Sequence, residues 1–180
     1  FKKLESKGVC SFDSLMAAAQ SYDFRYYALI GSIPADENRC FLLEGYLYPD
    51  TYEFYIGEKP QDAIGRFLKN AQSKITAADQ ARAAELGLST DQILTVASII
   101  QKEGSKASEV ANVAAVIYNR LKAGQKLQMD ATINYIEYYV KNYIDGDTGR
   151  YNNYYNTYKC AALPAGPICN PGRSTIYAAL

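Results

Sequence analysis

The sequence predicts an α+β fold that is rich in helices and contains a few short strands. Apolar residues recur at helical spacing in several segments, and residues that cap helices precede them. One aromatic and apolar run, residues 41–55, is broken by Gly45 and Pro49, which favours short extended segments joined by a turn. The 180 residues suit one domain and contain no repeat or low-complexity linker, so we expect a single domain over residues 1–180.

The first part of the chain contains three segments with helix-starting residues. Ser11 is a plausible N-cap, Pro60 fits the first turn of a helix, and Thr76 with Asp79 forms a capping-box pattern. The predicted helices cover residues 10–27, 60–74 and 76–86.

Two further helices are predicted to pack against each other as a hairpin. The first covers residues 89–104, where Ser89 and Gln92 form a capping box and Gly104 ends the helix. The second covers residues 107–122, and its apolar stripe consists of Val110, Val113, Ala114, Ile117 and Leu121. A last helix is expected over residues 129–140, followed by a polar loop and a stiff proline-rich loop at residues 163–172.

Glu103 is the acidic residue with the best-defined position. At about 100° per residue it lies close to the azimuth of Val96, on the apolar face of its helix, while Gln101 and Lys102 point away. A carboxylate at the end of an apolar stripe loses solvation, and the negative pole of the helix further disfavours its ionisation. Both effects favour the protonated form, which suits a general acid.

Composition excludes several classes of function. The chain has no histidine, which removes Ser-His-Asp and Cys-His nucleophiles and histidine-ligated zinc. Nineteen basic and nineteen acidic residues cancel without a basic block, which argues against a nucleic-acid partner. No glycine-rich phosphate loop or Cys-x-x-Cys spacing is present, so we expect neither a metal nor a cofactor.

The four cysteines leave two states open. Cys160 with Cys169 and Cys10 with Cys40 would make two disulfides that fit an extracellular compartment, whereas four reduced and mostly buried thiols are equally consistent with the sequence. The seventeen tyrosines suit half-buried surfaces and also the stacking faces of a sugar groove.

A single well-placed glutamate favours one type of sugar chemistry. Ordinary glycosidases use two carboxylates, but one acid suffices when the sugar supplies its own attacking hydroxyl, as in a lytic transglycosylase. Five segments of the chain, in order, resemble the YceG-like endolytic murein transglycosylases. They are LEGYLYPDTYEF (43–54), ILTVASIIQKE (93–103), VAAVIYNRLKAGQKLQMDATI (113–133), YNTY (155–158) and LPAGPICNPG (163–172).

The resemblance implies a catalytic domain that cleaves the MurNAc-β-1,4-GlcNAc bond inside glycan strands and leaves a 1,6-anhydroMurNAc end. The family usually has two glutamates where this chain has Gln101 and Glu103, so Glu103 is the acid that remains. If the acid belonged at position 101, the chain would be an inactive relative or an engineered variant. By resemblance, the substrate-binding residues are Asn119, Gln128, Asp130, Tyr155, Asn156 and Tyr158.

The resemblance also implies a location and partners. The family acts on peptidoglycan strands at the outer face of the cytoplasmic membrane, held by an N-terminal anchor, and works beside the cell-wall synthesis machinery. We therefore expect an extracytoplasmic protein whose only membrane contact is an anchor outside this chain, with a LysM-like segment also outside it.

Two alternatives stay open at this point. A muramidase that hydrolyses the same bond would need a second carboxylate, for which Asp130 and Glu44 are candidates. A tyrosine-rich glycan-binding or scaffold module would bind the same strands without turnover.

Overall fold

The computed structural model describes residues 1–104 and 108–180, and within these ranges every regular element is a helix. The helices are α1 (Lys2–Ser6), α2 (Phe12–Ser21), α3 (Ala28–Gly31), α4 (Pro60–Lys74), α5 (Ala77–Glu85), α6 (Thr90–Glu103), α7 (Val110–Lys122), α8 (Asp130–Tyr135), the π-helical turn η1 (Ile136–Val140), α9 (Lys141–Tyr143), the 3-10 turn η2 (Thr148–Tyr151), α10 (Asn152–Tyr155) and α11 (Arg173–Ala179).

The helix starts predicted from capping residues are confirmed. The Ser11 side chain accepts a hydrogen bond from Ser14 N at the start of α2, and Pro60 begins α4. Complete capping boxes begin α5 at Thr76 and α6 at Ser89. The predicted helix over 107–122 is observed from Val110, and Ala107 lies outside the described residues.

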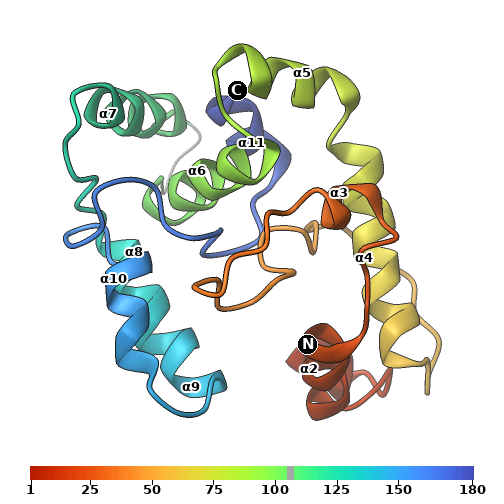
Figure 1. The fold of residues 1–180 in the computed structure, drawn as a ribbon. Coiled ribbons are helices and arrows are strands. Elements are labelled where there is room, and N and C mark those ends of the chain that lie inside the picture. Colours follow the sequence, from red (N-terminus) through yellow and green to blue (C-terminus); the bar gives the residue numbers. More distant parts are fainter. Residues whose placement is uncertain (105–107) are drawn as a thin grey trace.

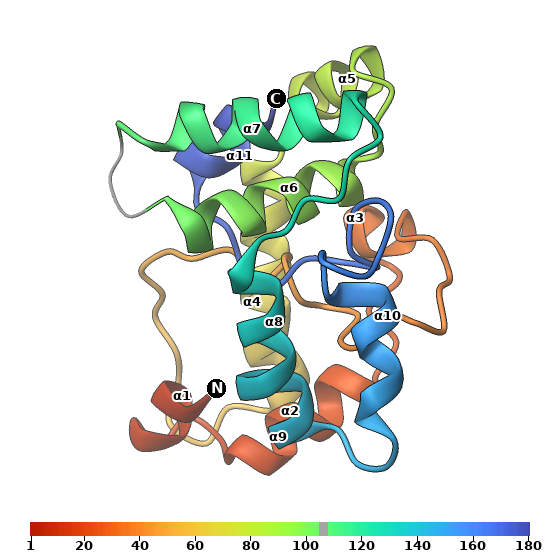
Figure 2. The same cartoon turned by 90° about the vertical axis from the view of Figure 1, so that its left-hand side faces the viewer.

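Helix α6 forms the centre of the molecule. Every residue from Ile93 to Ile100 is buried, which is typical of a helix surrounded by protein on all sides. Figure 1 shows α5, α7 and α11 on one side of α6, with α8 to α10 and the α2–α4 pair on the other. Helix α7 runs back along α6 as the predicted hairpin, and α11 contacts both helices (Figure 2).

The prediction of short strands over residues 41–55 is wrong, because the described structure has no strand there or elsewhere in residues 1–104 and 108–180. The backbone turns instead, with Tyr46 N bonded to Leu43 O, and Gly45 has a φ of +93°. The Asn170 side-chain oxygen accepts hydrogen bonds from Gly45 N and Leu47 N, both at 2.9 Å. A side chain from the proline-rich loop thus satisfies backbone donors that a neighbouring strand would otherwise bind.

A buried ion pair fixes this turning segment to the start of α6. The Arg39 guanidinium donates to both carboxylate oxygens of Asp91 at 2.8 and 2.9 Å, and the two side chains are 5% and 13% exposed. Arg39 also donates to Glu44 O, and the Tyr46 hydroxyl donates to Asp91 at 2.8 Å. The position of Glu44 beside α6 therefore depends on this pair.

The polar segment after residue 144, predicted as a loop, contains η2 and α10. Tyr151 and Tyr155 from these turns are buried, and the Tyr155 ring packs on Tyr135 with a centroid distance of 5.3 Å. Long-range aromatic packing thus orders residues whose local sequence favours a loop. The predicted helix over 129–140 is observed as α8 and η1.

None of the helices in the described ranges combines the length and the apolar character needed to cross a membrane.

Candidate active site

Glu103 is the last residue of α6, and its side chain is half-buried against the start of α8. One carboxylate oxygen accepts a hydrogen bond from Ala131 N at 3.1 Å. Ala131 is the second residue of α8, where backbone N–H groups have no partner within the helix. The end of α6 and the beginning of α8 therefore hold the Glu103 carboxylate between them.

Three of the predicted substrate-binding residues gather at the same place. The Tyr158 hydroxyl donates to the Asp130 carboxylate at 2.6 Å. This bond raises the pKa of Tyr158, and the charges of Asp130 and Glu103 raise it further. Gln128 precedes this pair with a φ of +52°, and its backbone N–H donates to Thr157 O. All three residues are exposed, and Asp130 directly precedes Ala131, whose N–H binds Glu103.

Two buried threonines hold this cluster together, and sequence reasoning missed both. The Thr157 hydroxyl accepts from Met129 N at 2.8 Å and lies 3.0 Å from the hydroxyl of Thr132. Thr132 donates in turn to Met129 O at 2.7 Å. Since both threonines are fully buried, these bonds fix the segment before α8 against the segment that carries Tyr158.

The other predicted residues occupy different environments. Tyr155 is 1% exposed, and its hydroxyl accepts a hydrogen bond from Cys40 N, so it is a core residue and not an open groove wall. Asn156 is 8% exposed, and its side-chain oxygen accepts from Tyr158 N at 2.9 Å, which shapes the turn that presents Tyr158. Asn119 is exposed on α7, a different helix from the two that hold Glu103.

Gln101 occupies the position where the resemblance leads us to expect a glutamate. Its side-chain oxygen accepts hydrogen bonds from Gly172 N at 3.1 Å and from the Thr175 hydroxyl at 3.3 Å. Gln101 therefore joins α6 to the first turn of α11, on a different side of the helix from the Glu103–Ala131 contact.

Glu44 is a carboxylate whose surroundings raise its pKa far above the ordinary value. One of its oxygens accepts a hydrogen bond from the Asn170 amide at 3.0 Å. Burial raises the pKa of Glu44 from 4.5 to about 7, and the positive charges of Lys102 and Arg39 offset part of this effect. Sequence patterns gave no sign of this, because the groups that bury Glu44 come from distant segments.

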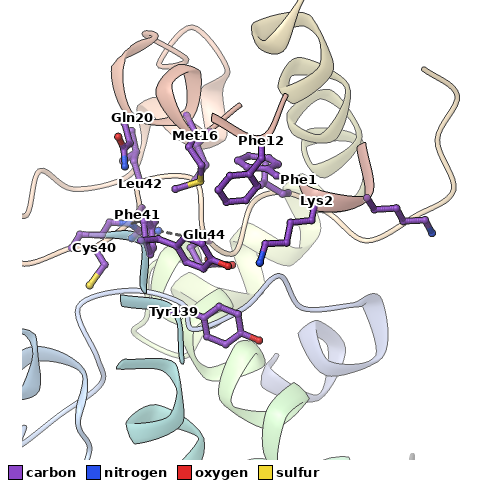
Figure 3. A pocket seen from close by; sticks show the side chains of 16 residues that line it. Phe1, Lys2, Phe12, Met16, Gln20, Cys40, Phe41, Leu42, Glu44 and Tyr139 are labelled. Carbon is purple, nitrogen blue, oxygen red and sulfur yellow. Dashed lines mark hydrogen bonds between the residues drawn. The ribbon is translucent and has the colours of Figure 1, made fainter. Parts of the chain in front are cut away.

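Glu44 lines a cavity of about 590 Å³ between α2, the turning segment and the η1–α9 region. Figure 3 shows Phe12 and Met16 on one side of it, with Glu44 and Tyr139 facing them. Tyr139 also lines a recess of about 220 Å³ that includes Ala131, the residue bonded to Glu103. The cavity and the recess thus share Tyr139 as a lining residue.

The acidic and thiol side chains are spread over the described ranges, 1–104 and 108–180. No group of three or more carboxylate or thiol side chains there is arranged to hold a metal ion. Cys10, Cys40, Cys160 and Cys169 are all free thiols, and burial raises the pKa of Cys40 and of Cys169 to about 12. At neutral pH these thiols are protonated, and neither of the two possible disulfides is formed.

Comparison with known proteins defines the class of this fold. A crystal structure of a YceG-like protein from Listeria monocytogenes matches with a TM-score of 0.80 and 28% sequence identity, over 99% of this chain and 60% of that chain. The sequence profile of the YceG-like family matches residues 2–180. The chain belongs to the YceG-like family.

Two relatives of this chain are both named endolytic murein transglycosylase. The chain is 34% identical over 139 residues to the endolytic murein transglycosylase of Bacillus subtilis strain 168. It is 30% identical over 158 residues to the endolytic murein transglycosylase of Streptococcus pneumoniae serotype 2. These alignments cover 77% and 84% of this chain, which spans only 38% and 28% of the two relatives.

Proposed function

We propose that this chain is the catalytic domain of an endolytic peptidoglycan lytic transglycosylase. The observation that carries the proposal is the position of Glu103, half-buried at the end of α6 and next to the Asp130–Tyr158 pair. The names of the relatives from Bacillus subtilis and Streptococcus pneumoniae support murein as the substrate. Residues 1–180 would form a single catalytic domain of a longer protein.

The proposed reaction uses one acid twice. Glu103 first donates its proton to the oxygen that links MurNAc to GlcNAc, and the C1–O bond breaks with that oxygen leaving as a GlcNAc hydroxyl. The carboxylate then removes the proton from the C6 hydroxyl of the same MurNAc while that oxygen bonds to C1. The product is a 1,6-anhydroMurNAc end, and the proton returns to Glu103.

The residues around Glu103 have separate proposed roles. Asp130 is a carboxylate that would stabilise positive charge developing on the sugar ring, and its bond to the Tyr158 hydroxyl would hold it in place. Gln128 can both donate and accept hydrogen bonds, which suits an acetamido group. Asn156 would act through the turn that presents Tyr158.

A comparison of two neighbouring substitutions tests this assignment. Glu103→Gln removes the acid and keeps the side-chain shape, so the rate of glycan release from purified sacculi should fall by about 100-fold or more. Gln101→Ala removes the bonds to Gly172 and Thr175 and should lower the melting temperature while turnover persists. Full turnover by the Glu103 variant would refute the assignment.

The properties of Glu44 favour a second candidate function, that of a muramidase. Burial raises the pKa of this carboxyl to about 7, a value that suits general acid–base work, and it lines a cavity. A muramidase that used Glu44 as its second carboxylate would add water to the cleaved bond. The mass of the released fragments separates the two reactions, because only hydrolysis adds a water molecule.

The same proposal extends to location and partners. A protein that cleaves peptidoglycan acts outside the cytoplasmic membrane, and a membrane anchor would lie in a part of the protein outside residues 1–180. The cell-wall synthesis machinery is the proposed set of protein partners.

A further inference from the structure

We propose that the cavity beside Glu44 is a separate sugar-binding site, in which Tyr139 stacks on an N-acetylated sugar ring while Glu44 and Tyr135 bind its hydroxyl or acetamido groups. This inference rests on the proposed function, because it gives the same glycan strand a second place of contact. The cavity holds about 590 Å³, which is room for more than one sugar ring, and it lies apart from the Asp130–Tyr158 pair.

The walls of the cavity have the character of a carbohydrate site. Phe12, Phe41 and Tyr139 supply aromatic rings, and Gln20 and Glu44 supply polar groups (Figure 3). Tyr143 adds a further aromatic ring to the lining. Aromatic rings offer flat apolar faces, and a few fixed polar groups then orient the ligand. Pyranose rings match this combination, because they present an apolar C–H face and hydroxyl groups at the edge.

The hydroxyl of Tyr135 is an independent indication of a polar ligand. Among the described residues, it is the buried side-chain polar atom without any hydrogen-bond partner. Buried hydroxyl groups are rarely left unbonded in folded proteins. Tyr135 lines the recess that shares Tyr139 with the cavity, and burial, together with the charge of Glu44, raises the pKa of Tyr135. The Tyr135 hydroxyl is closed off in this structure, where the Tyr139 ring stacks on Tyr135 at 6.0 Å. A ligand hydroxyl would therefore accept from Tyr135 and donate to Glu44 once the Tyr139 ring shifts on binding.

The positive charges around Glu44 disfavour a cationic ligand. Lys102 and Arg39 both act on Glu44, the Lys102 ammonium lies 5.6 Å from the centre of the Tyr139 ring, and Lys2 lines the cavity. An amine from a stem peptide would meet these positive charges. Hydroxyl and acetamido groups carry no such penalty, so an N-acetylated sugar is favoured over the amine of a stem peptide.

The second site can act together with Glu103. Tyr139 belongs to both the cavity and the recess, and the recess includes Ala131, which donates its N–H to Glu103. A glycan strand that bends over Tyr139 would place one sugar near Glu44 and another near Glu103. The structure therefore suggests that the enzyme binds several consecutive sugars, as cleavage inside a strand requires.

Binding is measured by calorimetry in a Glu103→Gln background, so that no substrate is consumed. The probes are glycan strands freed of stem peptides by an amidase, and the N-acetylglucosamine tetramer. Tyr139→Ala and Glu44→Ala should each weaken binding about tenfold, which corresponds to about 1.4 kcal/mol. Tyr177→Ala and Glu85→Gln change an exposed tyrosine and an exposed glutamate elsewhere and should leave binding unchanged.

Glu44→Gln supplies a second readout that loss of folding would not mimic. Glycan affinity should change between about pH 6 and pH 8 when position 44 is glutamate and stay constant when it is glutamine. Affinity equal to that of the parent in both the Tyr139 and the Glu44 alanine variants would overturn the inference, even if Glu103→Gln abolishes turnover. Full turnover by Glu103→Gln would instead refute the proposed function and leave the binding result standing.

Discussion

The pH dependence of stability tests the environment of Glu44 without any substrate. Burial raises the pKa of this carboxyl from 4.5 to about 7, so the folded protein holds the proton more tightly than the unfolded chain does. Each pH unit between these values is worth about 1.4 kcal/mol. The ionised side chain therefore destabilises the fold by at most about 3.5 kcal/mol, and Glu44→Gln removes this cost.

The sign of the effect follows from proton binding. Between pH 4.5 and about 7 the native state binds more protons at Glu44 than the unfolded state, so this contribution to stability falls as the pH rises. Above about pH 7 the loss is complete and the contribution becomes constant. The stability of the Glu44→Gln variant relative to the parent should therefore increase across this window and then level off.

Urea denaturation at a series of pH values measures this difference directly. Glu44→Gln keeps an oxygen that can accept the hydrogen bond from Asn170, so packing changes little. Glu85→Gln is the matched control, because the Glu85 side chain is 65% exposed, and its difference from the parent should vary little with pH. A Glu44→Gln difference that is the same at acidic and alkaline pH would show that Glu44 is not desolvated.

Two further predictions concern the segment that carries Glu44. Asp91→Asn leaves the Arg39 guanidinium buried without its counter-charge. Urea denaturation should show that the free energy of unfolding falls by roughly 3 to 5 kcal/mol. A loss below about 1 kcal/mol would contradict the role of the pair. Gly45→Ala places a methyl group 2.4 Å from Pro167 Cγ, whereas Gly57→Ala has a similar positive φ and meets no atom within 4 Å. Thermal denaturation should show a clearly larger loss for Gly45→Ala, and equal losses would argue against close packing on the proline-rich loop.

The local rules of helix formation were enough to predict most of the helical frame. Ser89 with Gln92 and Thr76 with Asp79 cap their helices through contacts three residues apart, so the sequence alone contains both partners. The strands were predicted wrongly for the opposite reason. The donors of Gly45 and Leu47 bind Asn170, which lies 125 and 123 residues further along the chain.

Helix α11 was missed because its first turn depends on distant partners. Arg173 donates to the Asp79 carboxylate at 2.7 and 3.0 Å, and Gly172 N donates to Gln101. A helix of seven residues is marginal by itself, so these long-range contacts decide whether it forms. Nothing in the local sequence of residues 173–179 reveals them.

The candidate site was predictable where it depended on a helix face. Glu103 was selected from its azimuth on α6, and the family resemblance supplied Asp130 and Tyr158, which hydrogen bond to each other. Tyr155 shows the limit of this reasoning, because a motif does not reveal that its ring lies in the core. The cavity at Glu44 could not be predicted, since its walls combine residues of the first 47 positions with Tyr139 and Tyr143.

Cleavage of sacculi in water labelled with heavy oxygen tests the central claim most directly. Intramolecular attack by the MurNAc C6 hydroxyl incorporates no oxygen from water, so fragments released by the parent protein should be unlabelled and should end in anhydroMurNAc. Fragments from the Glu103→Gln variant should be absent. Labelled reducing ends, or unlabelled fragments released at the parent rate by the Glu103 variant, would contradict a mechanism in which Glu103 is the acid and then the base.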